Sequence, residues 1–157
     1  MGIEIERKFL LCSDDWRQEA DQGCEYRQGY LQGDTSIAVR VRVAGDAAWL
    51  TIKGDADGII RREFEYPIPV ADAVDMLAHL CRQPPIEKRR YQVRYGRHVW
   101  EIDVFQGVNA GLVLAEIELT SADEVFERPP WLGEEVSTDP RYFNASLSRH
   151  PYREWGR

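Results

Sequence analysis

The sequence has few cysteines and no long apolar run. Its cysteines, Cys12, Cys24 and Cys81, are odd in number and lack the paired spacing of a zinc site. They predict reduced thiols rather than a disulfide framework or a structural zinc centre. No apolar stretch approaches the roughly 20 residues of a membrane-spanning helix, and the N-terminus lacks a signal-peptide core. We therefore expect a cytoplasmic protein with no membrane partner.

Basic residues are fewer than acidic ones. The chain has 20 Lys and Arg against 27 Asp and Glu, which gives a net charge of -7. A negative surface repels the phosphate backbone, so we expect no nucleic-acid partner. The net charge is a sum over the whole chain, however, and does not exclude a pocket with its own balance of charges.

The chain has enough apolar residues to form a core. It is 157 residues long, with 43% hydrophobic and 11% aromatic residues. This composition is too apolar for a disordered protein, and the length suits one domain. No repeat, linker or low-complexity tract divides the sequence, so we predict a single domain over residues 1–157.

Charged side chains recur at every second position of several short segments. In a β-strand this spacing puts the charged side chains on one face and the intervening apolar residues on the other. The same spacing places Arg61, but not Arg62, on the charged face. The charged series comprises Glu4, Glu6, Lys8, Arg40, Arg42, Lys53, Arg61, Glu63, Glu65, Lys88, Arg90, Glu101, Asp103, Glu116 and Glu118.

The pattern predicts a mainly β protein with a few helices. Glycine-containing turns at 45–46, 54–58 and 96–97 indicate antiparallel hairpins. Helices are expected over 14–21, 70–82 and 122–127, with a last short helix after Asp139-Pro140. The predicted strands are residues 3–10, 25–32, 36–43, 47–53, 59–66, 87–95, 98–105 and 112–119.

The charged face permits two interpretations. A single strand of this kind usually belongs to an open antiparallel sheet whose polar face lies in water. Eight strands can instead close into a barrel covered by helices, with an interior about wide enough for one small ligand. Charges inside it must neutralise each other or a ligand, because desolvating an unpaired ion is costly. Arg and Lys suit phosphate oxygens, whereas clustered carboxylates suit Mg²⁺ or Mn²⁺.

The ordered motifs of the chain resemble the CYTH superfamily, also called the triphosphate tunnel metalloenzymes. The opening ExExK motif is weak by itself, but the set in order over nearly the whole chain is specific. The resemblance implies an eight-stranded closed antiparallel barrel that acts on triphosphates with a divalent metal, and it is strongest to short bacterial tripolyphosphatases. The motifs are Glu4–Lys8, Gln28–Leu31, Arg40–Arg42, Thr51–Lys53, Glu63–Glu65, Lys88–Tyr91, Glu101–Asp103, Glu116–Glu118 and Asp139–Tyr142.

The resemblance also implies roles for individual residues. Glu4, Glu6 and one of Glu116 or Glu118 would hold a metal that bridges the phosphates. Glu63, Glu65 and the remaining acid of that last pair would hold a second metal that polarises the attacking water. Lys8 or Lys88 would assist the leaving phosphate. Glu101 and Asp103 would orient the basic residues, or are plain salt-bridge partners. The residues expected to bind substrate are Lys8, Tyr30, Arg40, Arg42, Lys53, Arg61, Lys88 and Arg90.

The function we predict is metal-dependent hydrolysis of inorganic tripolyphosphate to pyrophosphate and orthophosphate. The chain is short and shows no insertion that would grip a base or another organic group. The alternatives are a class IV type adenylate cyclase, a thiamine triphosphatase and a non-catalytic binder of polyphosphates or nucleotides. A binder is expected to have lost metal-binding acids, and none is lost here. The sequence leaves open whether the protein is a monomer or a homodimer.

Overall fold

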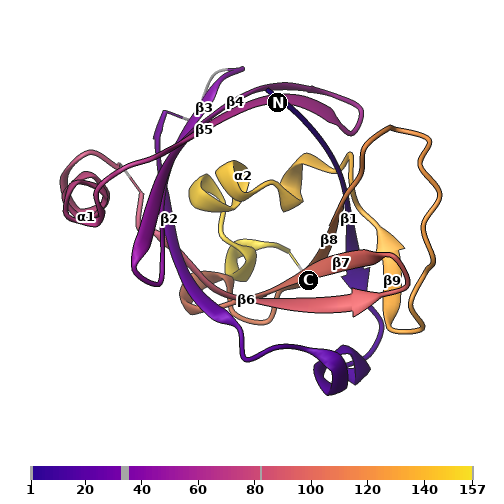
Figure 1. Cartoon of the computed structure of the whole chain (residues 1–157). Helices are drawn as coiled ribbons and strands as arrows, with labels where there is room; N and C mark the ends of the chain where they lie inside the picture. The colour runs from indigo at the N-terminus through magenta and orange to yellow at the C-terminus, as the bar shows by residue number, and fades with distance from the viewer. Residues whose placement is uncertain (1, 33–35, 82, 157) are drawn as a thin grey trace.

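The fold is a closed antiparallel β-barrel. The computed structural model describes residues 2–32, 36–81 and 83–156. In these residues the strands form one sheet in the order β5-β4-β3-β2-β6-β7-β8-β1-β9, and β5 also pairs with β1, which closes eight strands into a ring (Figure 1). The strands are β1 (Ile3–Leu11), β2 (Cys24–Gln32), β3 (Ala38–Ala44), β4 (Ala47–Asp57), β5 (Ile60–Pro67), β6 (Ile86–Tyr95), β7 (His98–Phe105), β8 (Val113–Glu118) and β9 (Leu132–Glu135).

Tight glycine turns join neighbouring strands. Gly45 (φ 62°) lies between β3 and β4, and Gly96 (φ 61°) lies between β6 and β7, as the sequence predicts. Positive φ is favourable for glycine because it has no Cβ. The predicted turn at 54–58 is wrong in extent: β4 continues to Asp57, and the turn falls at Gly58 (φ 63°). The pairing register shifts between Lys53 and Ala56, so Gly54 lies at a bulge within the strand rather than at its end.

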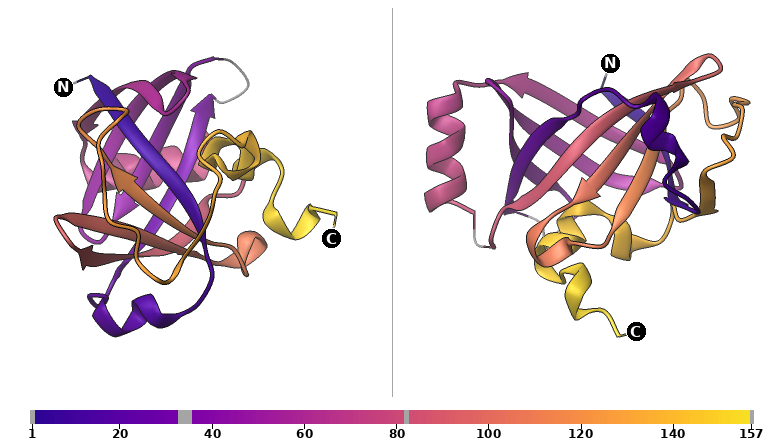
Figure 2. Two further views of the ribbon diagram at one scale, coloured as in Figure 1. Left: turned by 90° about the vertical axis from the view of Figure 1, so that its right-hand side faces the viewer. Right: turned by 90° about the horizontal axis from the view of Figure 1, so that it is seen from below.

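The apolar face of the barrel points outward. Over β1, β7 and β8 it forms a core that includes Phe9, Trp100 and Ile117. The α1 helix (Val70–His79) covers β3 and β4 by packing Ala73 and Leu77 on Val41 and Ala48 (Figure 2). None of the helices in the described part of the chain combines the length and the apolar character that a bilayer span requires.

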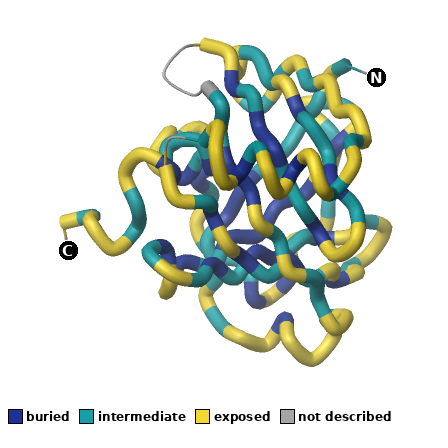
Figure 3. Tube along the Cα trace, turned by 90° about the vertical axis from the view of Figure 1, so that its left-hand side faces the viewer, coloured by how far each residue is buried: buried dark blue, intermediate teal, exposed yellow. Residues whose placement is uncertain are grey.

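Part of the outer face is left uncovered, contrary to the expectation that helices enclose the barrel. Ile52 on β4 and Phe64 and Tyr66 on β5 are 37%, 44% and 53% exposed. Figure 3 shows this mixture of buried and exposed positions along the strands. α1 is ten residues long and spans only part of the sheet, so the neighbouring strands keep their outer apolar residues in solvent.

The helices predicted from sequence are confirmed in part. The segment 14–21 contains a 3-10 helix, Asp15–Glu19, and α1 ends at His79, so the predicted extension to 82 fails; residue 82 itself lies outside the described residues. After Asp139 the chain forms a 3-10 helix, Pro140–Tyr142, followed by α2 (Asn144–Arg149). Two further 3-10 helices are Gly107–Asn109 and Tyr152–Glu154.

The predicted helix over 122–127 is wrong. The Glu124 carboxylate accepts hydrogen bonds from the backbone N–H (2.6 Å) and hydroxyl (2.8 Å) of Thr120, and lies 2.6 Å from His98 Nε2. Phe126 packs edge-on against Trp100. These contacts hold the segment as an extended cover over the outer core, because they satisfy the side chains of Glu124 and Phe126 without a helix.

The sequence did not predict β9, which packs tightly on β1. A Cβ at Gly133 would lie 2.9 Å from the Leu10 carbonyl oxygen. We expect Gly133→Ala to lower the free energy of unfolding by about 1–3 kcal/mol, because a rigid backbone atom must move. Urea denaturation measures this change. Gly54→Ala is the matched control, since its Cβ meets no atom closer than 3.7 Å. An unchanged midpoint for Gly133→Ala would show that β9 shifts freely on β1.

Candidate active site

The barrel interior is a charged cavity of about 300 Å³. Strand parity places its lining: Glu4, Glu6 and Lys8 face inward from β1, whereas Phe9 lies in the outer core. Arg61 lines the cavity and Arg62 is exposed, as the sequence predicts. Among the described residues, seven basic and seven acidic side chains line the cavity: Lys8, Arg40, Arg42, Lys53, Arg61, Lys88 and Arg90 with Glu4, Glu6, Glu63, Glu65, Glu101, Glu116 and Glu118.

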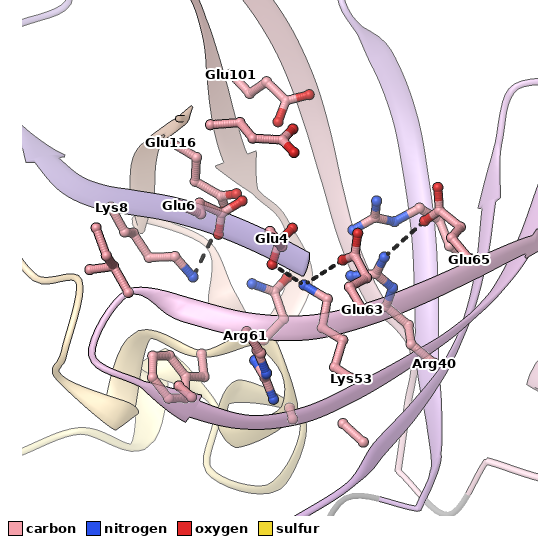
Figure 4. Close-up of a pocket in the computed structure, with 18 of the residues that line it drawn as sticks. Glu4, Glu6, Lys8, Arg40, Lys53, Arg61, Glu63, Glu65, Glu101 and Glu116 are labelled. Atoms are coloured by element: carbon pink, nitrogen blue, oxygen red, sulfur yellow. Dashed lines mark hydrogen bonds and ion pairs between the residues drawn. The ribbon is translucent and has the colours of Figure 1, made fainter. Parts of the chain in front are cut away.

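Strand pairing brings opposite charges together. Lys8 is opposite Glu116 in the β1–β8 register, and Lys53 is opposite Glu63 in the β4–β5 register. The Lys8 ammonium lies 3.9 Å from the Glu116 carboxylate and donates to the Tyr142 carbonyl at 3.1 Å. Figure 4 shows these side chains converging from several strands. Many of the charges that line the cavity are therefore paired with one another.

The basic side of the cavity rests on Asp103, which lies beneath the lining. Asp103 is fully buried and accepts two hydrogen bonds from Arg90, at 2.7 and 2.8 Å, and its carboxylate lies 2.7 Å from Lys88 Nζ. Burial would raise the pKa of Asp103, but Arg90 and Lys88 outweigh it and lower this pKa. Burial lowers the pKa of Lys88 to about 7, although Asp103 opposes this change. Glu101, 3.3 Å from Arg90, contacts the same guanidinium from the cavity side.

The acidic side is a cluster of carboxyl groups that repel one another. Burial, then the neighbouring Glu116 and Glu4, raises the pKa of Glu6 well above its usual value. Burial would also raise the pKa of Glu116, but Lys8, Arg90 and Lys88 hold it well below its usual value. The pKa of Glu118 is raised by burial and by Glu4 and Glu63. For Glu6 and Glu116 the two pKa values therefore move in opposite directions: that of Glu6 rises and that of Glu116 falls.

Lys53 lies between carboxylates from two other strands. Its ammonium is 3.1 Å from Glu4 and 3.2 Å from Glu63 (Figure 4). Burial and Arg40 would lower the pKa of Lys53, but Glu4, Glu6 and Glu63 raise it, so the side chain stays charged. A cation of the protein itself thus neutralises the acidic side of the cavity.

Arg40 lines the cavity and has one nitrogen without a partner among the described residues. Its Nη2 donates to Thr51 at 3.2 Å and to Glu65 at 3.5 Å. Its Nε is sealed from solvent and has no hydrogen-bond partner in the described part of the chain. A buried N–H without a partner is costly.

The chemistry of the acidic cluster suits a divalent cation. Burial and the neighbouring carboxyl groups disfavour the charged form of Glu6, and a cation would relieve this; oxygen ligands are those that Mg²⁺ and Mn²⁺ prefer. Within the described ranges, however, no group of three or more His, Cys, Asp or Glu side chains stands ready to hold a metal ion. The Lys53 ammonium lies between two of these acids, Glu4 and Glu63.

Every predicted site residue lines the cavity except Asp103, which is buried beneath Arg90 and Lys88. Tyr30 also lines the cavity. Sequence reasoning missed Tyr26 and Trp49, although Tyr26 is in step with Gln28 and Tyr30 on β2. It also missed Ser137, Phe143, Asn144 and Ala145, which the C-terminal part of the chain brings to the cavity. No charged alternation marks that segment, so only tertiary contacts reveal it.

Comparisons with known proteins agree with this geometry. The CYTH domain family matches residues 2–152. The chain is 48% identical over 155 residues to an inorganic triphosphatase of Acetivibrio thermocellus, covering 99% of both chains. It is 39% identical over 150 residues to an inorganic triphosphatase of Nitrosomonas europaea, covering 92% of this chain and 96% of that one.

A crystal structure of an inorganic triphosphatase has the same fold. It superimposes with a TM-score of 0.65 and 36% sequence identity, and the match covers 92% of this chain and 93% of that one. The family match extends over nearly the whole chain and includes every strand of the barrel and α2. The chain therefore belongs to the CYTH domain family.

Proposed function

We propose that this chain hydrolyses inorganic tripolyphosphate to pyrophosphate and orthophosphate with the help of Mg²⁺ or Mn²⁺. The observation that carries the proposal is the barrel cavity, which among the described residues is lined by seven basic and seven acidic side chains. A triphosphate brings negative charge to the basic side chains, and a divalent ion brings positive charge to the acidic ones. A metal-bound triphosphate supplies both at once, so it suits a cavity lined by charges of both signs. The names of the two bacterial relatives agree with this substrate.

The basic residues bind the triphosphate and neutralise charge as it develops. The cavity is lined by Arg40, Arg42, Lys53, Arg61 and Arg90. Preorganised cations of this kind stabilise the transition state of phosphoryl transfer, because they need not reorient as charge moves.

Lys88 and Lys8 assist the leaving phosphate. The pKa of Lys88 is lowered to about 7 by burial, so this side chain both holds and releases a proton near neutral pH. Lys8 stays beside Glu116 at 3.9 Å and brings positive charge to the same region. Tyr30 also lines the cavity, opposite Arg40 in the β2–β3 register.

The carboxylates would hold the metal. Glu4, Glu6 and one of Glu116 or Glu118 form the first group, and Glu63, Glu65 and the remaining acid form the second. When bound, a divalent cation neutralises phosphate oxygens and lowers the pKa of bound water. Glu101 and Asp103 keep Arg90 and Lys88 oriented.

Among the described residues, two of the four aromatic rings that line the cavity, Tyr26 and Phe143, already contact cations. The Tyr26 ring already contacts the guanidinium groups of Arg42, at 4.9 Å, and Arg90, at 5.0 Å. A base would have to displace one of these cations to stack there. We therefore favour the inorganic chain over ATP as substrate.

A substrate panel tests this function. Tripolyphosphate, ATP, thiamine triphosphate and pyrophosphate are incubated with Mg²⁺, Mn²⁺ or EDTA, and orthophosphate and cyclic AMP are measured. We expect EDTA-sensitive cleavage of tripolyphosphate with little turnover of ATP. Cyclic AMP production, preferential cleavage of thiamine triphosphate, or binding without turnover would each replace this function by the corresponding alternative.

Calcium should inhibit the reaction. Ca²⁺ accepts looser geometry and longer oxygen distances than Mg²⁺, so we expect it to bind the same carboxylates but to support turnover at least roughly tenfold more slowly. Steady-state rates with Mg²⁺ at increasing Ca²⁺ measure this competition. Equal rates with the two ions would contradict a site in which strict metal geometry matters.

A further inference from the structure

Asn144, the first residue of α2, holds two residues of the barrel at once. Its Oδ1 accepts a hydrogen bond from Lys88 Nζ at 2.9 Å and another from Gln28 Nε2 at 2.9 Å. Asn144 is 9% exposed and lines the cavity. Figure 1 shows α2 lying inside the outline of the barrel. The C-terminal segment thus reaches the same basic side of the cavity that the strands build.

The groups at the two ends of this network, on Arg42 and Lys88, can only donate, and this fixes the direction of its hydrogen bonds. Arg42 Nε can only donate, so Gln28 Oε1 accepts, at 2.8 Å. The other end of the Gln28 amide is then its NH₂ group, which donates to Asn144. Lys88 can also only donate, so the atom of Asn144 that receives both bonds is its oxygen.

This assignment leaves the NH₂ group of Asn144 for the cavity. In residues 2–32, 36–81 and 83–156, no hydrogen bond uses Asn144 Nδ2. Among the described residues, the buried side-chain atoms that reach neither solvent nor a hydrogen-bond partner are Trp16 Nε1, Arg40 Nε and Trp100 Nε1. Asn144 Nδ2 is not one of them. Two N–H donors on a residue that lines the cavity therefore remain open to an anion.

The cations near Asn144 repel one another, so an acceptor such as its Oδ1 stabilises them. The pKa of Arg42 is lowered to about 10 by burial, then by Arg40 and Arg90. Arg90 and Arg42 likewise lower the pKa of Lys88. A neutral carbonyl oxygen holds the Lys88 ammonium directly, and the Arg42 guanidinium through Gln28, without cancelling the positive charge that attracts phosphate.

We propose that Asn144 is a positioning residue of the triphosphate site, which aligns Lys88 and the Gln28–Arg42 pair and turns its own NH₂ group toward a phosphate oxygen. The proposal rests on the proposed function, since it names a further residue of the same site. Under this proposal, Arg42 on β3 and Lys88 on β6 are correctly arranged only when α2 is docked on the barrel.

A double-mutant cycle tests this role. Tripolyphosphate affinity is measured by calorimetry without metal for the wild type, Asn144→Ala, Lys88→Ala and the double variant. We expect Asn144→Ala to weaken binding about tenfold, since a hydrogen bond to a charged group is lost. We expect a smaller further loss when Lys88 is already Ala, because Asn144 acts partly through Lys88. Additive losses, or an unchanged affinity of Asn144→Ala, would overturn the proposal.

Two more variants separate positioning from a general effect on folding. Ser146→Ala, on the same helix but away from the cavity, should bind as the wild type does. Asn144→Asp keeps the acceptor and the shape but replaces the NH₂ group by a charged oxygen, so we expect an unchanged urea midpoint and a loss of affinity of tenfold or more. If Asn144→Ala does not fold, this variant decides, and unchanged affinity in it overturns the proposal. Failure of the wild type to bind tripolyphosphate would instead overturn the proposed function.

Discussion

Glu6→Gln should lose at least about 100-fold in metal-dependent turnover. A bound metal ion contributes several kcal/mol to transition-state stabilisation, and each 1.36 kcal/mol changes the rate by about a factor of ten. Glu6 lies in the acidic cluster, where Glu116 and Glu4 already raise its pKa. Gln has the shape of the protonated carboxyl group, so the fold of the metal-free protein tolerates it. It supplies no negative charge, however, to a divalent cation. Steady-state kinetics over a range of Mg²⁺ concentrations measure the loss.

The same variant should be at least as stable as the wild type without metal. The folded protein holds the Glu6 proton more tightly than the unfolded chain, because the pKa of Glu6 is raised on folding. The free energy of unfolding therefore falls as the pH rises from the unfolded pKa, about 4.3, through the raised folded value. Glu6→Gln removes this loss at neutral pH, so its urea midpoint in EDTA should equal or exceed that of the wild type.

The control for this variant is a glutamate outside the cavity. Glu87 on β6 is half exposed, and its carboxylate lies 3.9 Å from Arg27. Glu87→Gln should change neither turnover nor stability measurably, because exposed ion pairs contribute little. A Glu6→Gln protein with full activity would remove Glu6 from the metal site.

Asp103→Ala should lower the free energy of unfolding by about 3–5 kcal/mol, the largest stability loss we expect in this chain. Asp103 is fully buried and pairs with both Arg90 and Lys88 at 2.7 Å. Without it Lys88 can lose its proton, since its pKa is already lowered to about 7. Arg90 cannot, so a buried guanidinium is left with only its weaker contacts to Glu101 and Glu116.

Urea denaturation at several pH values measures this effect. Arg90 and Lys88 lower the pKa of Asp103 in the folded state, so its contribution is complete above the unfolded pKa of about 3.9 and is lost as the pH falls through the lowered folded value. The difference between wild type and variant should therefore narrow only in strong acid.

An exposed ion pair provides the comparison. Glu25 on β2 lies 2.9 Å from Arg89, and its side chain is 54% exposed. Glu25→Ala should cost at most about 1 kcal/mol, because solvent screens this pair. Equal losses for Asp103→Ala and Glu25→Ala would show that the buried carboxylate does not hold the basic residues together.

Local errors in the sequence analysis have identifiable causes. The segment 122–127 contains residues that a helix tolerates, but Glu124 binds Thr120 and lies beside His98, and Phe126 packs on Trp100. The glycine at 54 suggests a turn, yet the strand continues past it as a bulge. In both cases contacts with distant strands decide the local conformation.

The C-terminal part of the site was also beyond sequence reasoning. Asn144 bonds Gln28 and Lys88, which are 116 and 56 positions away. Ser137 accepts a hydrogen bond from the Lys8 backbone across 129 positions. An uncharged Asn or Ser in a short segment has no periodic pattern, so nothing local distinguishes it from a surface residue.

The sequence by itself determined which residues of each strand share a face, and its ordered motifs indicated the family and, through the family, the closed barrel. The first follows because successive side chains of a strand point to opposite faces, so every second residue lies on the same side of the sheet. Only the tertiary structure decided which charges pair. It placed Lys53 between Glu4 and Glu63, raised the pKa of Glu6 and buried Asp103 beneath Arg90 and Lys88. Those properties depend on distance and burial. Both are set by the closure of the whole sheet and not by the order of residues in any one strand.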